Sequence, residues 1–157
     1  MNKKYETLDE GKIISVNNFI FEDGSLDHAW NKGRLCLILY SNEEFEYILP
    51  IKSTLNNNYK DKYYINNDSM LYFYDNIYSE PTLREYNGRS INKKIMLNAK
   101  GRQNIEGYIN LNNIYKIPVT FRNEVAKISY DVYQNVIKKL YYFHKVKNEE
   151  EIKKLAL

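Results

Sequence analysis

Two apolar segments separated by three polar residues constrain the fold of this chain more than any other feature of its sequence. Arg34 to Tyr40 ("RLCLILY") and Glu44 to Leu49 ("EFEYIL") flank the tripeptide "SNE", a spacing that is typical of a β-hairpin. The first segment is apolar and predicts a fully buried strand. Apolar and charged residues alternate at the start of the second segment, which predicts a half-buried strand.

Four further segments have the composition of strands. They are Ile13 to Phe21, Lys62 to Ile65, Met70 to Tyr74 and Ile105 to Asn110. The long polar stretch "EDGSLDHAWNKG" separates the first of them from the hairpin and predicts a loop. Thr82 to Ala99 carries mixed signals that are compatible with short helices.

The apolar period changes near residue 120, where the spacing becomes that of an amphipathic helix. The apolar positions of this helix are Val125, Ile128, Val132, Val136 and Leu140. Pro118 lies just upstream and either Thr120 or Asn123 can act as the N-cap, so we expect a helix from Asn123 to about His144. The charged tail "KVKNEEEIKKLAL" extends this helix, forms a short second helix, or frays.

A chain of 157 residues fits one domain, and we expect residues 1–157 to form it. The predicted class is α+β. It consists of a compact, strongly curved antiparallel sheet or barrel with a long C-terminal amphipathic helix packed against it.

Composition excludes several functions. The single cysteine, Cys36, lies in an apolar segment and cannot form a disulfide or a cysteine-based metal site within one chain. There are two histidines and no HExxH, DxDxDG, GxGxxG or GxxxxGKS/T motif, so we expect no metal and no other cofactor. No apolar run reaches 18 residues and the N-terminus lacks a secretory signal, which predicts a soluble, cytoplasmic protein without a membrane partner.

The hairpin also predicts a site. In an antiparallel pair the start of the first strand lies beside the end of the second, so Lys32 and Arg34 should approach Lys52 and Ser53. Such a group of cations with a hydroxyl suits a phosphodiester, because the cations neutralise charge that develops on the nonbridging oxygens. The alternative is that these are ordinary solvated residues at the ends of strands.

The order "GKIISV", a polar loop, "GRLCLILYS" and "YILPIKS" resembles the toxin barrels of the PemK/MazF type. "FEYILPIKS" is similar to the "KYLAPLTS" strand of the type III toxins ToxN and AbiQ. "GYINLNNIYKIPV" followed by a tyrosine-rich helix resembles the "G-x-INL…MIPV" segment and C-terminal helix of the same family. The Asn- and Tyr-rich sequence looks most like the CptN branch of these type III toxin–antitoxin proteins.

This resemblance implies a metal-independent endoribonuclease. In such toxins the ribose 2′-hydroxyl attacks the adjacent phosphate and leaves a 2′,3′-cyclic phosphate and a 5′-hydroxyl. The implied partners are an RNA substrate and an RNA antitoxin of repeated pseudoknots, which the toxin trims and which assembles with it into a closed complex; no DNA partner is implied. The alternatives are a PemK/MazF-type enzyme with a protein antitoxin and a non-catalytic RNA-binding barrel.

The resemblance also implies roles for individual residues. Ser53 matches the serine that follows the proline strand of the family, whereas Lys52 stands where the family usually has Thr or Ser. The basic residue that opens the preceding strand is either Lys32 or Arg34.

Two residues of the polar loop and several basic residues elsewhere are further candidates. His28 is either an acid or base or an ordinary surface residue, and Trp30 either stacks on a base or covers the edge of the core. The remaining candidates are cations that would contact RNA phosphates or else be solvated, namely Lys93, Lys94, Lys100, Arg102, Lys138 and Lys139.

Overall fold

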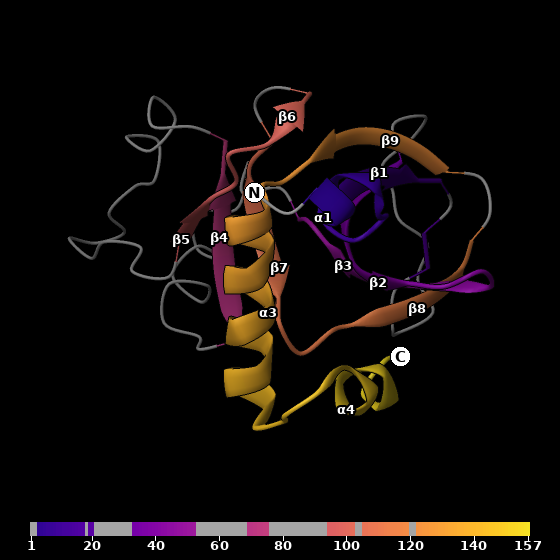
Figure 1. The fold of residues 1–157 in the computed structure, drawn as a ribbon, viewed down its shortest axis with the longest axis vertical. Helices are drawn as coiled ribbons and strands as arrows, with labels where there is room; N and C mark the ends of the chain where they lie inside the picture. The colour runs from indigo at the N-terminus through magenta and orange to yellow at the C-terminus, as the bar shows by residue number, and fades with distance from the viewer. Residues whose placement is uncertain are drawn as a thin grey trace.

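The computed structural model describes residues 3–17, 19–20, 33–52, 69–75, 94–102, 105–119 and 122–157. The fold is α+β and most strands pair in antiparallel sheets, as predicted (Figure 1). In chain order the helices and strands are α1 (Lys3–Thr7), β1 (Lys12–Val16), β2 (Arg34–Ser41), β3 (Phe45–Pro50), β4 (Met70–Tyr74), β5 (Lys94–Met96), β6 (Lys100–Gly101), β7 (Gly107–Asn110), β8 (Tyr115–Pro118), β9 (Arg122–Lys127), α3 (Tyr130–His144) and α4 (Glu149–Lys154). None of these helices combines the length and the apolar character that a membrane span requires.

The larger sheet has six strands in the order β6-β9-β1-β2-β3-β8, and all neighbouring pairs are antiparallel. The predicted hairpin forms two of its internal strands, β2 and β3. The side-chain oxygen of Asn42 accepts hydrogen bonds from the backbone N–H groups of Glu44 and Phe45, both at 2.8 Å, and so closes the turn between β2 and β3. The strand predicted at Ile13 to Phe21 is shorter than expected, because β1 ends at Val16.

The prediction that β3 is half-buried was wrong. All residues of β3 from Glu46 to Pro50 are buried, and Glu46 itself is 0% exposed. The strand is internal, since β2 pairs with one edge and β8 with the other. Tyr47 and Leu49 belong to one buried apolar cluster and Ile48 to a second, so both faces of β3 are covered.

The smaller sheet has the order β5-β4-β7, with β4 parallel to β5 and antiparallel to β7. The strand predicted at Met70 to Tyr74 is confirmed, and the strand predicted from Ile105 begins at Gly107. An isolated antiparallel bridge between Lys52 and Tyr108 joins the two sheets. No pairing among the described strands closes a barrel. The strand predicted at 62–65 and most of the 82–99 segment lie outside the described residues.

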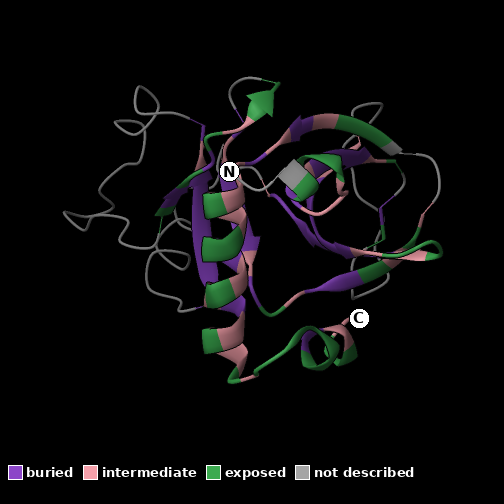
Figure 2. Cartoon of the chain, viewed as in Figure 1, coloured by how far each residue is buried: buried purple, intermediate pink, exposed green. Residues whose placement is uncertain are grey.

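Helix α3 packs against the smaller sheet (Figure 1). Its buried residues Val136 and Leu140 belong to the same cluster as Leu71, Phe73 and Ile109 of β4 and β7. The opposite side of the helix is exposed (Figure 2).

The helix is shorter than predicted, because it has 15 residues and begins at Tyr130 rather than Asn123. The preceding residues form β9 and pair with β1 and β6. Ala126 and Ile128 are both buried and lie two residues apart, as residues on one face of a strand do. Ile128 also fits a helical spacing with Val132 and Leu140. Cross-strand pairing therefore overrides the local periodicity.

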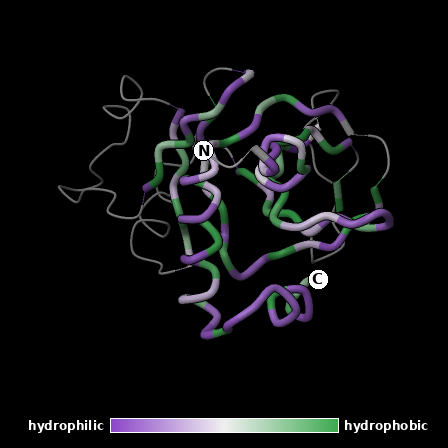
Figure 3. Tube along the Cα trace, in the orientation of Figure 1, coloured by the Kyte–Doolittle hydropathy of each residue, from purple (hydrophilic) through white to green (hydrophobic). Residues whose placement is uncertain are grey.

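The C-terminal tail forms a second helix, one of the three predicted outcomes. Asn148 caps α4 by accepting a hydrogen bond from the backbone N–H of Glu151 at 3.0 Å. The helix is largely hydrophilic (Figure 3), and Ile152 is its buried residue. Beyond it, the N–H of Leu157 donates to the carbonyl of Ile114 at 2.8 Å, so the tail lies along the outer edge of β8.

Candidate functional site

The base of the β2–β3 hairpin holds two of the predicted site residues. Cys36 is opposite Pro50 in the register, and the N–H of Ile51 donates to the carbonyl of Leu35 at 2.8 Å. Continuing the register places Arg34 opposite Lys52, on the same face of the sheet. Arg34 donates from Nη1 to the carbonyl of Ile51 at 3.0 Å. We call Arg34, Ile51 and Lys52 the hairpin base.

The hairpin base is fixed to the smaller sheet by a pair of backbone hydrogen bonds. The N–H of Lys52 donates to the carbonyl of Tyr108, and the N–H of Tyr108 donates to the carbonyl of Lys52, both at 2.8 Å. The approach is close enough to require a glycine at position 107, because a Cβ atom there would lie 2.3 Å from the carbonyl oxygen of Lys52. The fold thus positions Lys52 by backbone contacts from two sheets.

A row of aromatic residues continues from the hairpin base. Tyr108 lies opposite Lys52 in the bridge and opposite Tyr72 in the β4–β7 pair. The two tyrosine rings meet edge to face with centroids 4.9 Å apart. The hydroxyl of Tyr72 donates to Oε2 of Glu106 at 3.1 Å, which brings a carboxylate to the start of β7.

This arrangement combines groups that phosphoryl chemistry uses. Arg34 and Lys52 lie opposite each other in the continued register at one end of a hairpin, and a half-buried carboxylate, Glu106, lies one residue before the strand that anchors Lys52. Cations of this kind stabilise charge on nonbridging oxygens, and a carboxylate accepts or returns a proton.

Glu106, Tyr72 and Tyr108 were not among the site residues predicted from the sequence. One signal was available, because Gly107 lies within the segment Ile105 to Asn110 that was predicted to be a strand, and a glycine in a strand indicates a bulge or a close backbone approach. The identity of the approaching segment was not readable from the sequence, since Lys52 and Tyr108 are far apart in the chain.

The other predicted site residues fall into two groups. Lys94 on β5, Lys100 on β6, Arg102 just after β6 and Lys138 on α3 are exposed, and Lys139 on α3 is half-buried. These cations come from three parts of the chain, namely β5, β6 with the residue just after it, and α3. The second group lies outside the described residues: His28, Trp30, Lys32, Ser53 and Lys93.

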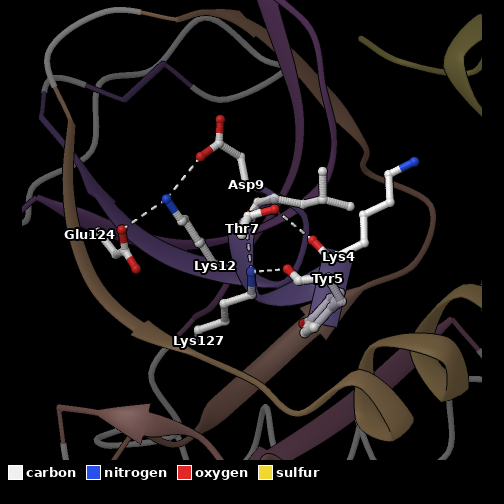
Figure 4. Close-up of polar contacts among 8 residues, drawn as sticks. Lys4, Tyr5, Thr7, Asp9, Lys12, Glu124 and Lys127 are labelled. Carbon is white, nitrogen blue, oxygen red and sulfur yellow. Dashed lines mark hydrogen bonds and ion pairs between the residues drawn. The ribbon is translucent and has the colours of Figure 1, made fainter. Parts of the chain in front are cut away.

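A second polar cluster joins α1 to the six-stranded sheet (Figure 4). Lys12 Nζ lies 2.9 Å from Oδ1 of Asp9 and 3.0 Å from Oε2 of Glu124. Lys127 Nζ donates to the backbone carbonyls of Tyr5 and Leu8 at 2.5 and 2.6 Å. Its ammonium group also lies 4.3 Å from the centre of the Tyr5 ring.

The contacts of these two lysines stabilise the fold. Burial lowers the pKa of Lys127, whereas the hydrogen bond to Asp9 raises the pKa of Lys12. The hydroxyl of Tyr5 donates to the carbonyl of Ile128 at 2.8 Å, and its burial raises the pKa of the phenol. The cluster therefore fixes the N-terminal helix to β1 and β9, and we assign it no ligand.

Comparison of the whole chain with protein-family models, with curated proteins and with solved structures finds no match in any of the three.

Proposed function

We propose that the protein is a metal-independent endoribonuclease whose catalytic centre is the hairpin base. The observation that carries the proposal is the meeting of Arg34 and Lys52 at one end of the β2–β3 hairpin, where Arg34 is held by the carbonyl of Ile51 at 3.0 Å. The resemblance of "YILPIKS" and "GYINLNNIYKIPV" to type III toxins supports the choice of RNA as the substrate.

In the proposed reaction the ribose 2′-hydroxyl attacks the adjacent phosphorus as it loses its proton. The bond from phosphorus to the 5′-oxygen breaks, and that oxygen takes up a proton, which leaves a 2′,3′-cyclic phosphate and a 5′-hydroxyl. Arg34 stabilises the charge on the nonbridging oxygens. Lys52 assists Ser53, its neighbour in the chain, in holding the phosphate. Lys32 and His28 are the additional candidates for phosphate stabilisation and for proton transfer.

Two finer features belong to the same proposal. We infer that the two sheets curve around a common interior as in barrels of the PemK/MazF type, which the bridge between Lys52 and Tyr108 supports. We also infer that the natural inhibitor is an RNA antitoxin of pseudoknot repeats, bound through phosphate contacts in a closed complex. The exposed lysines on α3, β5 and β6 support an anionic partner.

The test compares single alanine variants of Arg34, Lys52, Ser53 and Lys32 with the wild-type chain. Loss of one positioned donor typically lowers the rate by about 10²- to 10³-fold, so we expect cleavage and growth arrest to fall by that order. Arg34→Lys keeps the charge but loses the planar guanidinium and should recover little activity. Lys154→Ala, at an exposed position on α4, is the matched control and should cleave like the wild type.

The product ends and the melting temperature complete the test. Cleavage should persist in excess EDTA and give cyclic-phosphate ends; 3′-hydroxyl products, or activity that only Mg²⁺ restores, would contradict the mechanism. Normal cleavage by all four variants would place the catalytic centre elsewhere. A loss of activity that follows a collapse in melting temperature would assign these residues a purely structural role.

The alternative functions give different results. A non-catalytic RNA-binding protein would bind RNA without cutting it and would tolerate Ser53→Ala. An enzyme with a protein antitoxin would have a small open reading frame beside its gene, whereas short tandem repeats and a terminator upstream indicate an RNA antitoxin.

A further inference from the structure

A groove where α3 meets the smaller sheet has the chemistry of a second binding site. It has a volume of about 1010 Å³, at the upper end of the range for small-molecule sites and larger than one nucleobase needs. The described residues that line it are Met70, Leu71, Leu111, Asn135, Lys138, Lys139, Tyr142, Phe143 and Lys145. We call it the α3 groove.

All charged residues among the described residues that line the α3 groove are basic. Lys138, Lys139 and Lys145 line it, and the sequence contains no Asp or Glu from residue 132 to residue 148. Cations near the end of a helix also stabilise the helix dipole, which is the ordinary explanation for basic residues in the last turn. That explanation does not require them to border a groove together.

An aromatic ring stands at the edge of the groove. Tyr142 is 88% exposed, whereas Val136 and Leu140 of the same helix are fully buried. It lies three to four residues after Lys138 and Lys139, so the ring and the two ammonium groups occupy the same flank of α3. Phosphate-binding cations beside an exposed ring are the elements of a single-strand nucleic-acid site.

Lys145 gives an independent indication. It has φ 57° and ψ 43°, the left-handed conformation that helix C-caps usually assign to glycine. A side chain with a Cβ atom is strained there. Its backbone N–H reaches the last carbonyls of the helix, which glycine would do equally well. The cap therefore does not account for a lysine, whereas its side chain lines the groove.

We propose that the α3 groove binds a single-stranded segment of RNA, with one unstacked base on Tyr142 and phosphates on Lys138, Lys139 and Lys145. The inference rests on the proposed function for the choice of RNA. A membrane surface fits less well, because the apolar residues Val136 and Leu140 of α3 are fully buried against the sheet and cannot enter lipid. A duplex fits less well, because its bases are already stacked.

The test measures binding of the full chain to fluorescein-labelled 2′-O-methyl oligo(A) and oligo(U) of about eight nucleotides, a typical single-strand site size. These probes lack the attacking 2′-hydroxyl, so binding is measured without cleavage. Tyr142→Ala should weaken binding by about 5- to 100-fold, which corresponds to the loss of one stacked base, and Tyr142→Phe should retain it. Lys138→Ala combined with Lys139→Ala should reduce the slope of log affinity against log salt by about 1.4.

Lys145→Gly separates binding from stability. It should raise the melting temperature by about 2–4 °C, because glycine adopts the left-handed conformation without strain, and it should weaken oligonucleotide binding. Lys154→Ala, on α4 and outside the groove, is the control and should change neither quantity.

The outcomes distinguish this inference from the proposed function. Three results would overturn the proposal that the α3 groove binds single-stranded RNA, whatever the cleavage assays give. They are normal oligonucleotide binding by Tyr142→Ala, equal affinity for the duplex formed by the two probes, and binding only to anionic phosphatidylserine vesicles or to poly-glutamate. Binding that depends on Tyr142 and Lys145 supports the groove, even if Arg34 and Lys52 prove irrelevant to RNA cleavage.

Discussion

Replacing Gly107 with alanine tests whether the hairpin base is positioned by the close approach of the two sheets. The added Cβ atom would lie 2.3 Å from the carbonyl oxygen of Lys52 and 2.9 Å from Cγ2 of Ile51. The oxygen is part of the backbone and cannot rotate away, so the segment of Ile51 and Lys52 must move by about 1 Å to restore an ordinary contact. The two backbone hydrogen bonds between Lys52 and Tyr108, both 2.8 Å long, would then be broken or bent.

The expected loss of stability follows from these contacts. Two backbone hydrogen bonds contribute about 1 kcal/mol each, and overpacking costs about 1–3 kcal/mol. We therefore expect Gly107→Ala to reduce the free energy of unfolding by about 3–5 kcal/mol. For a chain of this length the melting temperature should fall by about 6–20 °C, measured by circular dichroism.

Gly107→Ala should also lower the activity of the molecules that remain folded. Arg34 is held by the carbonyl of Ile51, so a shift of that segment also misplaces the guanidinium group. A misplacement of about 1 Å costs about 10²-fold in rate. We expect this loss of RNA cleavage at a temperature well below the melting point of the variant.

Gly101→Ala is the matched control. Its Cβ atom would lie 2.5 Å from the carbonyl oxygen of Val125, and φ is 116°, so it too should destabilise the fold. Gly101 pairs with Ala126 at the β6 edge of the larger sheet, away from the hairpin base in the strand order. Cleavage should survive in this variant. Wild-type cleavage by Gly107→Ala, or an equal loss in both variants, would refute the reasoning.

Two further predictions concern the stability of the fold. Burial raises the pKa of Glu10, and the charge of Asp9 raises it further; the stability that Glu10 contributes is therefore complete below its unfolded pKa and is lost as pH rises through its folded pKa. Glu10→Gln should raise the melting temperature at pH 7 and not at pH 4, whereas Glu6→Gln, at an exposed position, should show no such difference in thermal melts. Ser129→Ala removes the side chain that accepts a hydrogen bond from the N–H of Val132 at the start of α3, and should cost about 1 kcal/mol in a denaturant titration; no change would mean that the cap is satisfied in another way.

The hairpin could be predicted because its signals are local. Its two segments, its turn and the proximity of Arg34 to Lys52 all depend on residues within about twenty positions of one another. The start of α3 could not be predicted, because Ile128 fits a helical spacing with Val132 and also a strand alternation with Ala126 until the pairing of β9 with β1 is known. The capping signal at Ser129 was present in the sequence but followed a segment already assigned to the helix.

The remaining part of the candidate site depends on contacts that no local pattern encodes. The alternation at the start of "EFEYIL" predicted a half-buried strand, yet Glu46 is buried on an internal strand whose second edge pairs with β8, from far along the chain. The row from Lys52 through Tyr108 to Tyr72 similarly requires the register of three separate strands. Gly107 was the one local sign of a close approach, and a single glycine does not identify its partner.

Strand β7 connects the two proposed RNA sites. Its first residues contact the hairpin base through Tyr108, and the residue after its end, Leu111, lines the α3 groove and accepts a hydrogen bond at 2.7 Å from Nε2 of His144. From Tyr108 to Leu111 the strand advances by about 10 Å. A hydrogen-bonded strand fixes this distance far better than a loop would. If both proposals hold, an RNA strand that occupies both sites must span a separation that the fold holds constant, and this separation sets a minimum number of nucleotides between the cleaved bond and the base that stacks on Tyr142.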